Sequence, residues 1–486
     1  MIFRQITHDD LGCASYLIGD AEAEVGAVVD PRFDIEEYLR LARYLGVRIE
    51  HVLETHNHAD HVSGHGRLAA ATGAVIHVHR EASPDYEHEP FDDGWELALG
   101  RVTVRALHTP GHRPEHTAFC LTDTARGERP WAVLTGDSMF VGDVARPDLA
   151  IEKSEGARGI FHSLHEKLLV LPDECELWPG HLGGSMCGGP GMDLKTSSTI
   201  GFERAANEML RIGDEEEFVE RALAGLGPQP PNFEAIVGLN RGPLVTDGVE
   251  VAPLAPRQVE SHRGEGALLV DVRTDTQFDE AHIAGAVCIP TMRAGFGTKL
   301  AWLADREQPI VLVGRDGSEA REAGRLALAV GIRRLAGYLD GGMSAWREEG
   351  RPVERIERLE VDELPARLAA AGAAGAAEVA GADAAGAAAA GGLQLLDVRE
   401  VSEWEEGHLA GSVHAPWHDI EGVPDGIDPT APVAVLCASG QRAATAVSLL
   451  QRFGGERVIH VVGGGVGRAL ELGLAPAGDP PGARGG

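Results

Sequence analysis

The 486-residue sequence contains no apolar run that approaches the roughly 18 residues needed to span a membrane. Residues 1–5 also lack the basic and then apolar layout of a secretory signal peptide. We therefore expect a soluble, cytoplasmic protein with no membrane partner. The chain is too long for one hydrophobic core, because domains usually contain about 100 to 200 residues, so several domains are expected.

Positive charge is scarce as well: 43 Lys and Arg residues stand against 75 Asp and Glu residues, a formal net charge of −32. Nucleic-acid binding depends on Lys and Arg side chains that displace counterions from phosphates, so we expect no nucleic-acid partner. The six cysteines form no CxxC pair, which favours reduced thiols over a disulfide framework. Cys13, Cys120, Cys175 and Cys288 lie in or beside apolar runs and are expected in the core.

What the sequence does contain is a cluster of histidines in its first half. Residues 1 to about 200 alternate short apolar strands with helical segments, which is typical of a layered α/β fold with chemistry on its loops. Residues 55–61 read Thr-His-Asn-His-Ala-Asp-His, and three later candidates each follow a glycine that lets the backbone turn into a crowded site. The candidate metal ligands are His56, His58, Asp60, His61, His112, Asp137 and His181.

The order of these motifs resembles the metallo-β-lactamase superfamily. The resemblance implies a four-layer αββα sandwich over about residues 1–200, with a metal site at one edge. The motifs are specific for the fold and the site, but they leave the reaction open.

The ligands suit two kinds of metal site. In one, zinc ions activate water for hydrolysis, as in glyoxalase II. That site would place His56, His58 and His112 on one ion and Asp60, His61 and His181 on the other, with Asp137 bridging. In the other, His56, His112 and Asp137 alone hold one ion, and two histidines with a carboxylate and open positions suit a non-heme Fe(II) oxygenase.

Residues 136–149, Gly-Asp-Ser-Met-Phe-Val-Gly-Asp-Val-Ala-Arg-Pro-Asp-Leu, resemble the persulfide dioxygenase branch of the superfamily. That resemblance implies one Fe(2+) per chain, bound by His56, His112 and Asp137. The residues left over would then orient the ligands and tune the site. They are His58, Asp60, His61 and His181.

Two more residues near these motifs are candidates for the active site. Arg146 could offer a cation to an anionic substrate, or it could hold its loop through Asp148 in a structural ion pair. Cys187 lies on a glycine-rich loop directly after His181 and could accept or pass sulfur, or be an unreactive small residue.

From about residue 250 the chain repeats itself. Asp271 and His282, in Asp-Val-Arg and His-Ile-Ala-Gly motifs, recur at the same spacing as Asp397 and His408. We expect a first copy at 249–355 and a second at 356–476, after a metal-binding domain at 1–248. An Ala/Gly-rich insertion at 369–392 and the tail 477–486 should be flexible, because the glycines break helix formation.

Both copies resemble the rhodanese family, which implies α/β domains with parallel sheets. In the second copy Cys437 follows an apolar strand, in the loop Cys-Ala-Ser-Gly-Gln-Arg that ends at Arg442. Such a loop points backbone N–H groups at the sulfur and stabilises a thiolate and its persulfide. Ala438 departs from the family pattern, since many members carry Arg there. The first copy has Gly314 and Glu319 where the nucleophile and the loop arginine belong, so it should be inactive.

Together these resemblances imply a bifunctional enzyme that oxidises a small persulfide with O2 to sulfite and transfers sulfur through Cys437 to give thiosulfate. The persulfide carrier would be of the glutathione or coenzyme A type, and the protein a homodimer or homotetramer. The alternative is a zinc-dependent thioester hydrolase of the glyoxalase II type with attached sulfurtransferase domains. Metal content and O2 consumption separate the two.

Overall fold

The computed structural model describes residues 1–476 apart from 190, 225, 293 and 379–391. Its internal contacts divide the chain into two compact units, residues 1–249 with 325–333 and residues 250–324 with 334–486. The tail 477–486, which we expected to be disordered, lies outside the described residues.

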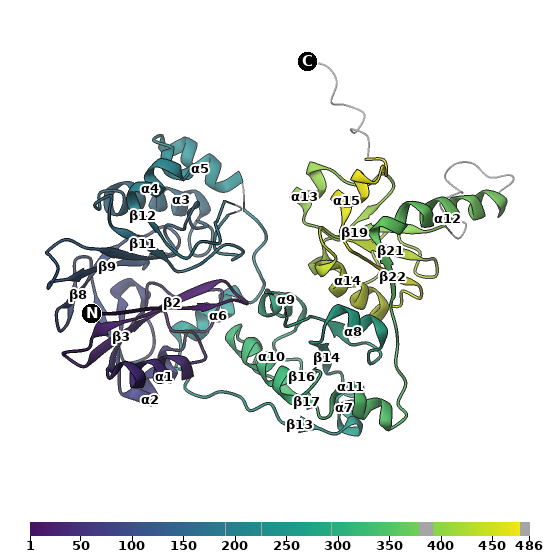
Figure 1. Cartoon of the computed structure of the whole chain (residues 1–486), viewed down its shortest axis with the longest axis horizontal. Helices are drawn as coiled ribbons and strands as arrows, with labels where there is room; N and C mark the ends of the chain where they lie inside the picture. Colours follow the sequence, from purple (N-terminus) through teal and green to yellow (C-terminus); the bar gives the residue numbers. More distant parts are fainter. Residues whose placement is uncertain (190, 225, 293, 379–391, 477–486) are drawn as a thin grey trace, which may run out of the picture. The chain divides into compact units, whose positions relative to one another are not determined.

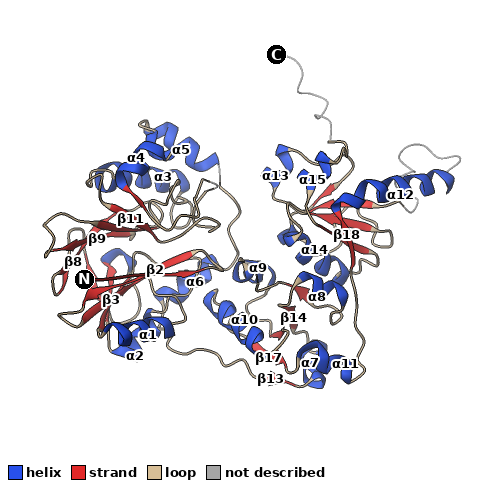
Figure 2. Ribbon diagram, in the orientation of Figure 1, coloured by secondary structure: helices blue, strands red, loops and turns tan. Residues whose placement is uncertain are grey.

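The first unit is built on two six-stranded sheets, and helices cover the outer face of each (Figures 1 and 2). One sheet contains β1 (Ile2–His8), β2 (Cys13–Asp20), β3 (Val25–Val29), β4 (Arg48–Leu53), β5 (Val75–His79) and β6 (Glu89–Phe91). The other contains β7 (Glu96–Leu99), β8 (Val102–His108), β9 (Thr117–Asp123), β10 (Ala132–Gly136), β11 (Glu176–Pro179) and β12 (Ser198–Thr199). The larger helices are α1 (Glu36–Leu45), α2 (His65–Thr72), α3 (Lys153–Ser163), α4 (Ile200–Ala206), α5 (Glu215–Ala224) and α6 (Phe233–Arg241).

Three hydrophobic cores hold these four layers together. One core lies between the sheets and includes Tyr16, Leu53 and Phe119. The other two lie between each sheet and its helices, around Tyr38 on one side and Phe218 on the other. Because both faces of the sheets are covered, β2, β3 and β10 are buried along their whole length. The predicted αββα sandwich is confirmed.

The second unit contains two five-stranded parallel sheets. The first copy has the strand order β13 (Pro253–Leu254), β17 (Leu335–Leu339), β16 (Ile310–Val313), β14 (Leu268–Asp271), β15 (Val287–Cys288). The second has β18 (Glu357–Glu360), β22 (Val458–Val462), β21 (Val433–Leu436), β19 (Gln394–Asp397), β20 (Val413–His414). The helices that belong to it wholly or in part are α7 (Pro256–Gly264), α8 (Asp275–Glu280), α9 (Phe296–Leu303), α10 (Gly317–Ala329), α11 (Gly342–Glu348), α12 (Leu364–Glu378), α13 (Val401–Glu406), α14 (Gln441–Arg452) and α15 (Val466–Glu471). The end of α10, from Arg325, belongs to the first unit. The predicted pair of parallel-sheet domains is confirmed.

Helix α12 corrects one prediction. It continues through residues 369–378, the first part of the Ala/Gly-rich stretch in which we expected glycine to prevent a helix. Alanine has the highest helix propensity and outnumbers glycine there, so the helix continues to Glu378. The rest of the stretch, from 379 to 391, lies outside the described residues.

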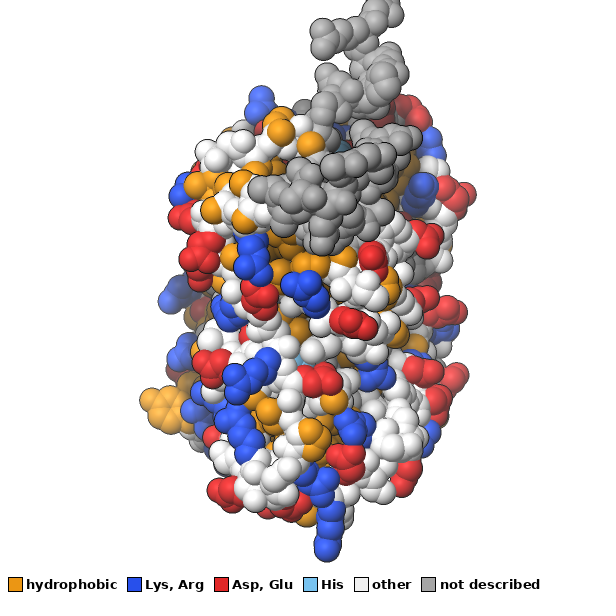
Figure 3. Space-filling model, turned by 90° about the vertical axis from the view of Figure 1, so that its right-hand side faces the viewer, with side chains coloured by type: hydrophobic (Ala, Val, Ile, Leu, Met, Phe, Trp, Pro, Cys, Tyr) orange, Lys and Arg blue, Asp and Glu red, His pale blue; other side chains and the backbone are white. Residues whose placement is uncertain are grey.

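None of the helices in the described part of the chain combines the length and the apolar character that a membrane crossing requires. On the face drawn in Figure 3, acidic and basic side chains are interspersed. The excess negative charge is therefore not collected into one patch on that face.

Candidate active sites

The first candidate site lies where strands of both sheets of the first unit end. His56 comes shortly after β4, His112 shortly after β8, and Asp137 directly after β10. All three side chains are buried, and their ligand atoms lie within 4.8 Å of one another. His56 Nε2 and His112 Nε2 lie 3.9 Å and 3.6 Å from Asp137 Oδ2. The structure thus brings together the three residues predicted to bind a single ion.

The atoms that face one another in this group are unused by the protein. Within the described residues, His56 Nε2, His112 Nε2 and Asp137 Oδ2 are buried without a hydrogen-bond partner. Leaving a polar atom in that state costs about 1 to 3 kcal/mol. A cation between the three atoms would satisfy all of them, and two imidazoles with a carboxylate are a donor set that suits Fe(II) or Zn(II).

Hydrogen bonds hold each imidazole ring by its other nitrogen. His112 Nδ1 donates to Arg146 O over 2.9 Å. His56 Nδ1 lies 2.9 Å from Thr55 Oγ1, whose hydroxyl donates to Asp30 Oδ2. The proton is therefore on Nδ1 in both rings, and Nε2 keeps its lone pair for a metal. Burial lowers the pKa of His112, and burial together with the neighbouring histidines lowers the pKa of His56 well below its usual value, so both rings are neutral.

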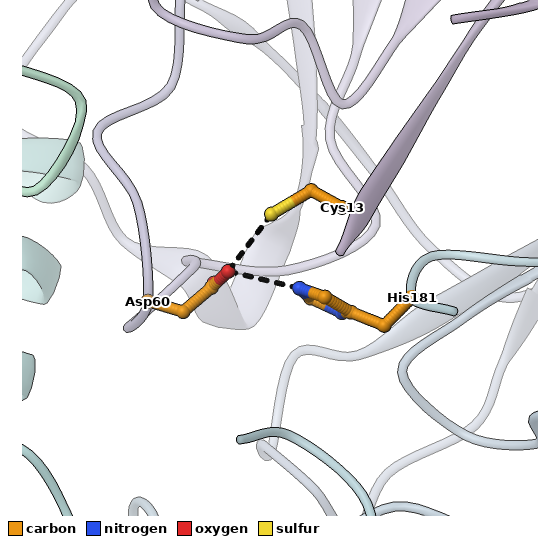
Figure 4. A group of neighbouring side chains, drawn as sticks. All are labelled: Cys13, Asp60 and His181. Carbon is orange, nitrogen blue, oxygen red and sulfur yellow. Dashed lines mark hydrogen bonds and ion pairs between the residues drawn. The ribbon is translucent and has the colours of Figure 1, made fainter. Parts of the chain in front are cut away.

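Asp137 uses its second carboxylate oxygen to hold His181. Asp137 Oδ1 accepts a hydrogen bond from His181 Nδ1 over 2.7 Å. On its other side, His181 Nε2 donates to Asp60 Oδ2 over 2.8 Å, as Figure 4 shows. Burial alone would lower the pKa of His181, but Asp137 and its other neighbours raise it well above its usual value. Burial would likewise raise the pKa of Asp137, but His181 brings it to about 2. In this arrangement His181 has no free lone pair for a second ion.

The remaining histidines of residues 55–61 lie beside carboxylates, although His58 Nε2 and His61 Nε2 make no hydrogen bond within the described residues. His58 Nε2 lies 3.2 Å from Asp30 Oδ1 and 3.3 Å from Glu54 Oε2. Burial would lower the pKa of His58, but these acids raise it well above its usual value. His61 Nδ1 lies 3.2 Å from both oxygens of Asp60. Ligand atoms of His58, Asp60 and His61 also lie within 4.8 Å of one another, but a second ion there would displace these ionic partners.

Cys13, which we assigned to the hydrophobic core, lies at this site. It is buried as expected, but its Sγ donates to Asp60 Oδ2 over 3.1 Å (Figure 4). The same sulfur lies 3.7 Å from His61 Nδ1. Burial, and after it the charge of Asp60, raises the pKa of the thiol well above its usual value. The contact arises because β2 begins beside the loop of His181, with Ala14 N donating to Gly180 O. No local sequence pattern marks such a pairing.

The guanidinium of Arg146 is hydrogen-bonded to its own loop and to two other segments of the chain. Its guanidinium donates to both oxygens of Asp148, over 2.7 Å and 3.0 Å, and to the carbonyl oxygens of Met186 and Gly227. Of the two roles predicted for Arg146, the observed contacts correspond to the structural ion pair. Its backbone carbonyl, which accepts from His112, gives it an additional positioning role.

Cys187 lies beside the same cluster. Its sulfur is within 4.8 Å of ligand atoms of Asp137 and His181, and Arg146 N donates to its carbonyl oxygen. Burial raises the pKa of Cys187 to about 12, so the sulfur carries a proton. Its predicted part in sulfur transfer stays a prediction, and it would require a base to remove that proton.

The second candidate site is the loop between β21 and α14. Cys437 directly follows the strand, and Gly440 N donates to Cys437 Sγ over 3.0 Å. Gly440 has φ 91°, a left-handed conformation that favours glycine, and it begins the turn into the helix. Arg442 Nη2 donates to Glu403 Oε1 over 2.8 Å. Burial would lower the pKa of Arg442, but its hydrogen bonds with Glu403, and after them the charge of Cys437, raise it overall.

The corresponding loop of the first copy is closed by a carboxylate. Glu319 accepts hydrogen bonds from Arg315 N over 2.6 Å and from Arg315 Nε over 2.9 Å. A Cβ atom on Gly314 would lie 2.9 Å from Asp316 O and 3.1 Å from Ala320 N. This loop therefore offers neither a nucleophile nor room for one.

Comparison with known proteins assigns the two parts of the chain. The model of the metallo-β-lactamase superfamily matches residues 8–181, and the model of the rhodanese-like domain matches residues 255–349 and 382–467. The mitochondrial persulfide dioxygenase ETHE1 of Homo sapiens is 28% identical over 228 residues, 46% of this chain and 82% of that protein. A probable metallo-hydrolase of Burkholderia pseudomallei (strain 1710b) is 30% identical over 246 residues, 43% of this chain and 81% of that protein. The chain belongs to the metallo-β-lactamase superfamily.

A solved structure extends this likeness beyond the first unit. The crystal structure of a metallo-β-lactamase from Staphylococcus aureus subsp. aureus COL is 29% identical, with a TM-score of 0.63, over 70% of this chain and 98% of that one. In the present chain, all the predicted metal ligands fall within residues 8–181, which match the superfamily model. Cys437 falls within the second rhodanese-like match.

Proposed function

We propose that the chain oxidises small persulfides at a mononuclear iron site held by His56, His112 and Asp137, and transfers sulfane sulfur through Cys437. The similarity to a persulfide dioxygenase supports the substrate class, and the rhodanese-like domains support sulfur transfer. The observation on which the proposal depends most is that three buried ligand atoms without a hydrogen-bond partner converge. His181, a candidate ligand of a second ion, has both ring nitrogens hydrogen-bonded to carboxylates, which favours one ion over two.

The first reaction is RSSH + O2 + H2O → RSH + SO3²⁻ + 2 H⁺. Fe(2+), when bound, supplies open coordination positions and the electron transfer that O2 requires. The residues of the chain fix the donor atoms: His181 holds Asp137 Oδ1, and the Arg146 carbonyl holds the His112 ring. Burial of all three ligands keeps their lone pairs away from competing water.

The second reaction is RSSH + SO3²⁻ → RSH + S2O3²⁻, in two steps at Cys437. The Cys437 sulfur attacks the outer sulfur of RSSH, whose S–S bond breaks as the thiol RSH leaves. Sulfite then takes that sulfur from the Cys437 persulfide and restores the cysteine. Gly440 N–H, 3.0 Å from Sγ, is placed to stabilise negative charge on the sulfur, and Arg442 adds a cation nearby.

Metal analysis together with O2 uptake tests the proposal. We expect purified protein to contain one iron per chain and to consume O2 with glutathione persulfide or coenzyme A persulfide. His56→Ala should lose both the iron and the O2 uptake, whereas His162→Gln, which changes an exposed histidine of the same unit, should keep both. Two zinc ions per chain with hydrolysis of S-lactoylglutathione, and no O2 uptake, would establish the alternative thioester hydrolase instead.

The same panel of persulfides identifies the thiol carrier, which we predict to be of the glutathione or coenzyme A type. We also predict a homodimer or homotetramer, which size measurement in solution checks. A monomer that oxidises persulfides at full rate would contradict the oligomer and leave the reaction in place.

A further inference from the structure

A buried histidine holds the cysteine loop of the second copy. His460 lies on β22 and is fully buried. Its Nε2 donates to Gly440 O over 2.9 Å. The backbone N–H of the same glycine donates to Cys437 Sγ over 3.0 Å. Gly440 therefore links the histidine to the sulfur.

The other nitrogen of this histidine contacts the first copy, which belongs to the same compact unit. His460 Nδ1 lies 2.8 Å from Asp279 Oδ2, on helix α8. Asp279 is buried too, and Arg358 Nη1 donates to the same oxygen over 2.6 Å. A carboxylate and a carbonyl both accept hydrogen bonds, so the ring donates from both nitrogens. A ring turned by half a rotation would place C–H groups at both acceptors, so the two contacts fix its orientation.

This arrangement is not a feature that the two copies share. The strand position of His460, paired with Val435, is occupied in the first copy by Tyr338, paired with Leu312. By the repeated spacing, the counterpart of Asp279 in the second copy is Glu405, which is exposed. The histidine is thus present in one copy and its acid in the other.

The helix that follows the cysteine loop is attached to the first copy as well. On α14, Thr445 Oγ1 donates to Cys288 O over 2.9 Å, and Cys288 N donates to Ser448 Oγ over 3.0 Å. Both side chains are buried. The loop of Cys437 is therefore held by the first copy at two points, through His460 and through α14.

We propose that the first copy, which has no nucleophile of its own, completes the sulfur-transfer site of the second. Asp279 is a positioning residue that acts on Cys437 through His460 and Gly440. The proposal rests on the sulfur transfer proposed above. It gives the inactive copy a role in the reaction, because the N–H group that faces the sulfur is held in place from the first copy.

Asp279→Asn in the full-length protein tests the proposal, with Asp275→Asn as its matched control. Asp275 lies on the same helix and pairs with the same Arg358, at 3.3 Å, but His460 contacts Asp279. We expect Asp279→Asn to lower kcat for thiosulfate formation about ten-fold, because the hydrogen bond from His460 loses its charged acceptor, with a smaller change in KM. The control should stay close to wild type. An equal loss in both variants would overturn the proposal.

A double-mutant cycle with His460→Phe separates positioning from a general loss of stability. If Asp279 acts through His460, Asp279→Asn should cost nothing further in the His460→Phe background. His460→Gln, whose amide can still donate to Gly440 O, should retain more activity than His460→Phe. Additive losses for Asp279→Asn and His460→Phe would contradict the proposed path.

Alkylation of Cys437, followed on its peptide by mass spectrometry, reports on the loop without any turnover. In Asp279→Asn the pH midpoint of alkylation should move upward by about half a unit to one unit, because a looser loop directs its N–H group less well at the thiolate. An unchanged midpoint would overturn the role of Asp279. If the wild type forms no thiosulfate, yet Asp279→Asn shifts the midpoint as expected, the proposed sulfur transfer alone would be overturned.

Discussion

The two rhodanese-like copies have the same strand order and differ in the loop that carries the nucleophile. Their strands β14 and β19 both end at the aspartate of an Asp-Val-Arg motif. After the central strands β16 and β21, the first copy continues with Gly314 and the second with Cys437. The shared frame establishes the fold, while the chemistry depends on a few residues of that loop.

The loops also use their hydrogen bonds differently. In the first copy a carboxylate, from Glu319, accepts the backbone N–H of Arg315. In the second copy the sulfur of Cys437 accepts a hydrogen bond from the N–H of Gly440. Arg442 occupies the position that corresponds to Glu319 of the first copy. A loop that binds its own carboxylate has no vacancy for an anion, whereas the second loop directs its donor at a sulfur that becomes anionic.

The largest expected effect comes from Cys437→Ser. A serine oxygen forms no persulfide, so thiosulfate formation should fall to the uncatalysed background while persulfide-dependent O2 uptake continues, with sulfite as its product. Parallel assays of O2, sulfite and thiosulfate measure this. Cys175→Ala, a change at a buried cysteine of the first unit, serves as control and should keep thiosulfate formation. Thiosulfate formation at the normal rate in Cys437→Ser would contradict the division of labour between the two units.

Arg442→Gln should have the next largest effect. It removes the cation near Cys437 and leaves Glu403 without its partner, so we expect thiosulfate formation to fall about ten-fold. The loss should be greater with an anionic acceptor such as sulfite than with a neutral thiol, and a comparison of the two acceptors tests this. Arg457→Gln, which removes a charge from an exposed position of the same copy, is the control. Equal losses in both variants would show that only net charge matters.

The converse substitution, Gly314→Cys, should not make the first copy active. The new Cβ would lie within 3.1 Å of two backbone atoms, so we expect a loss of about 1 to 3 kcal/mol in stability from overpacking. Thiosulfate formation is measured in the Cys437→Ser background, with unfolding of the same protein by urea. Sulfur transfer by that double variant would show that the first copy lacks only a cysteine and would contradict this prediction.

Much of this organisation follows from the sequence because the decisive patterns are local. The repeated Asp-Val-Arg and His-x-Ala-Gly motifs predict two copies of one domain, and the cysteine after an apolar strand predicts which copy carries the nucleophile. The metal ligands can be found in the same way, since each lies in a loop that follows a strand, β4 of one sheet or β8 and β10 of the other.

What sequence reasoning missed depends on contacts between residues far apart in the chain. Cys13 reaches Asp60 across the first unit, and His181 lies between Asp60 and Asp137. These pairings decide which ligand atoms remain unused, and no local pattern encodes them. The path from Asp279 to His460 is of the same kind, because its two residues belong to different copies.

The smallest expected effect is a pH-dependent contribution of Glu403 to stability, which only the second copy should have. Burial would raise the pKa of Glu403, but its hydrogen bonds with Arg442 lower it overall. A carboxyl whose pKa is lower in the folded state stabilises the protein above its unfolded value of about 4.3, and this stabilisation is lost as the pH falls through the lowered pKa. The first copy has Gln277 and Glu319 at the matching positions, so only the second copy should show this loss.

The Glu403→Gln variant isolates that contribution. Because the Glu403 side chain is 31% exposed, we expect the wild type to exceed the variant by less than about 1 kcal/mol in unfolding free energy at neutral pH. The difference should shrink below about pH 4, where the carboxyl of the wild type gains its proton. Gln277→Ala, at the matching position of the first copy, should give a difference that does not change with pH. A difference for Glu403→Gln that grows on acidification would have the wrong sign for an ion pair and would contradict the role given to Arg442 in the second loop.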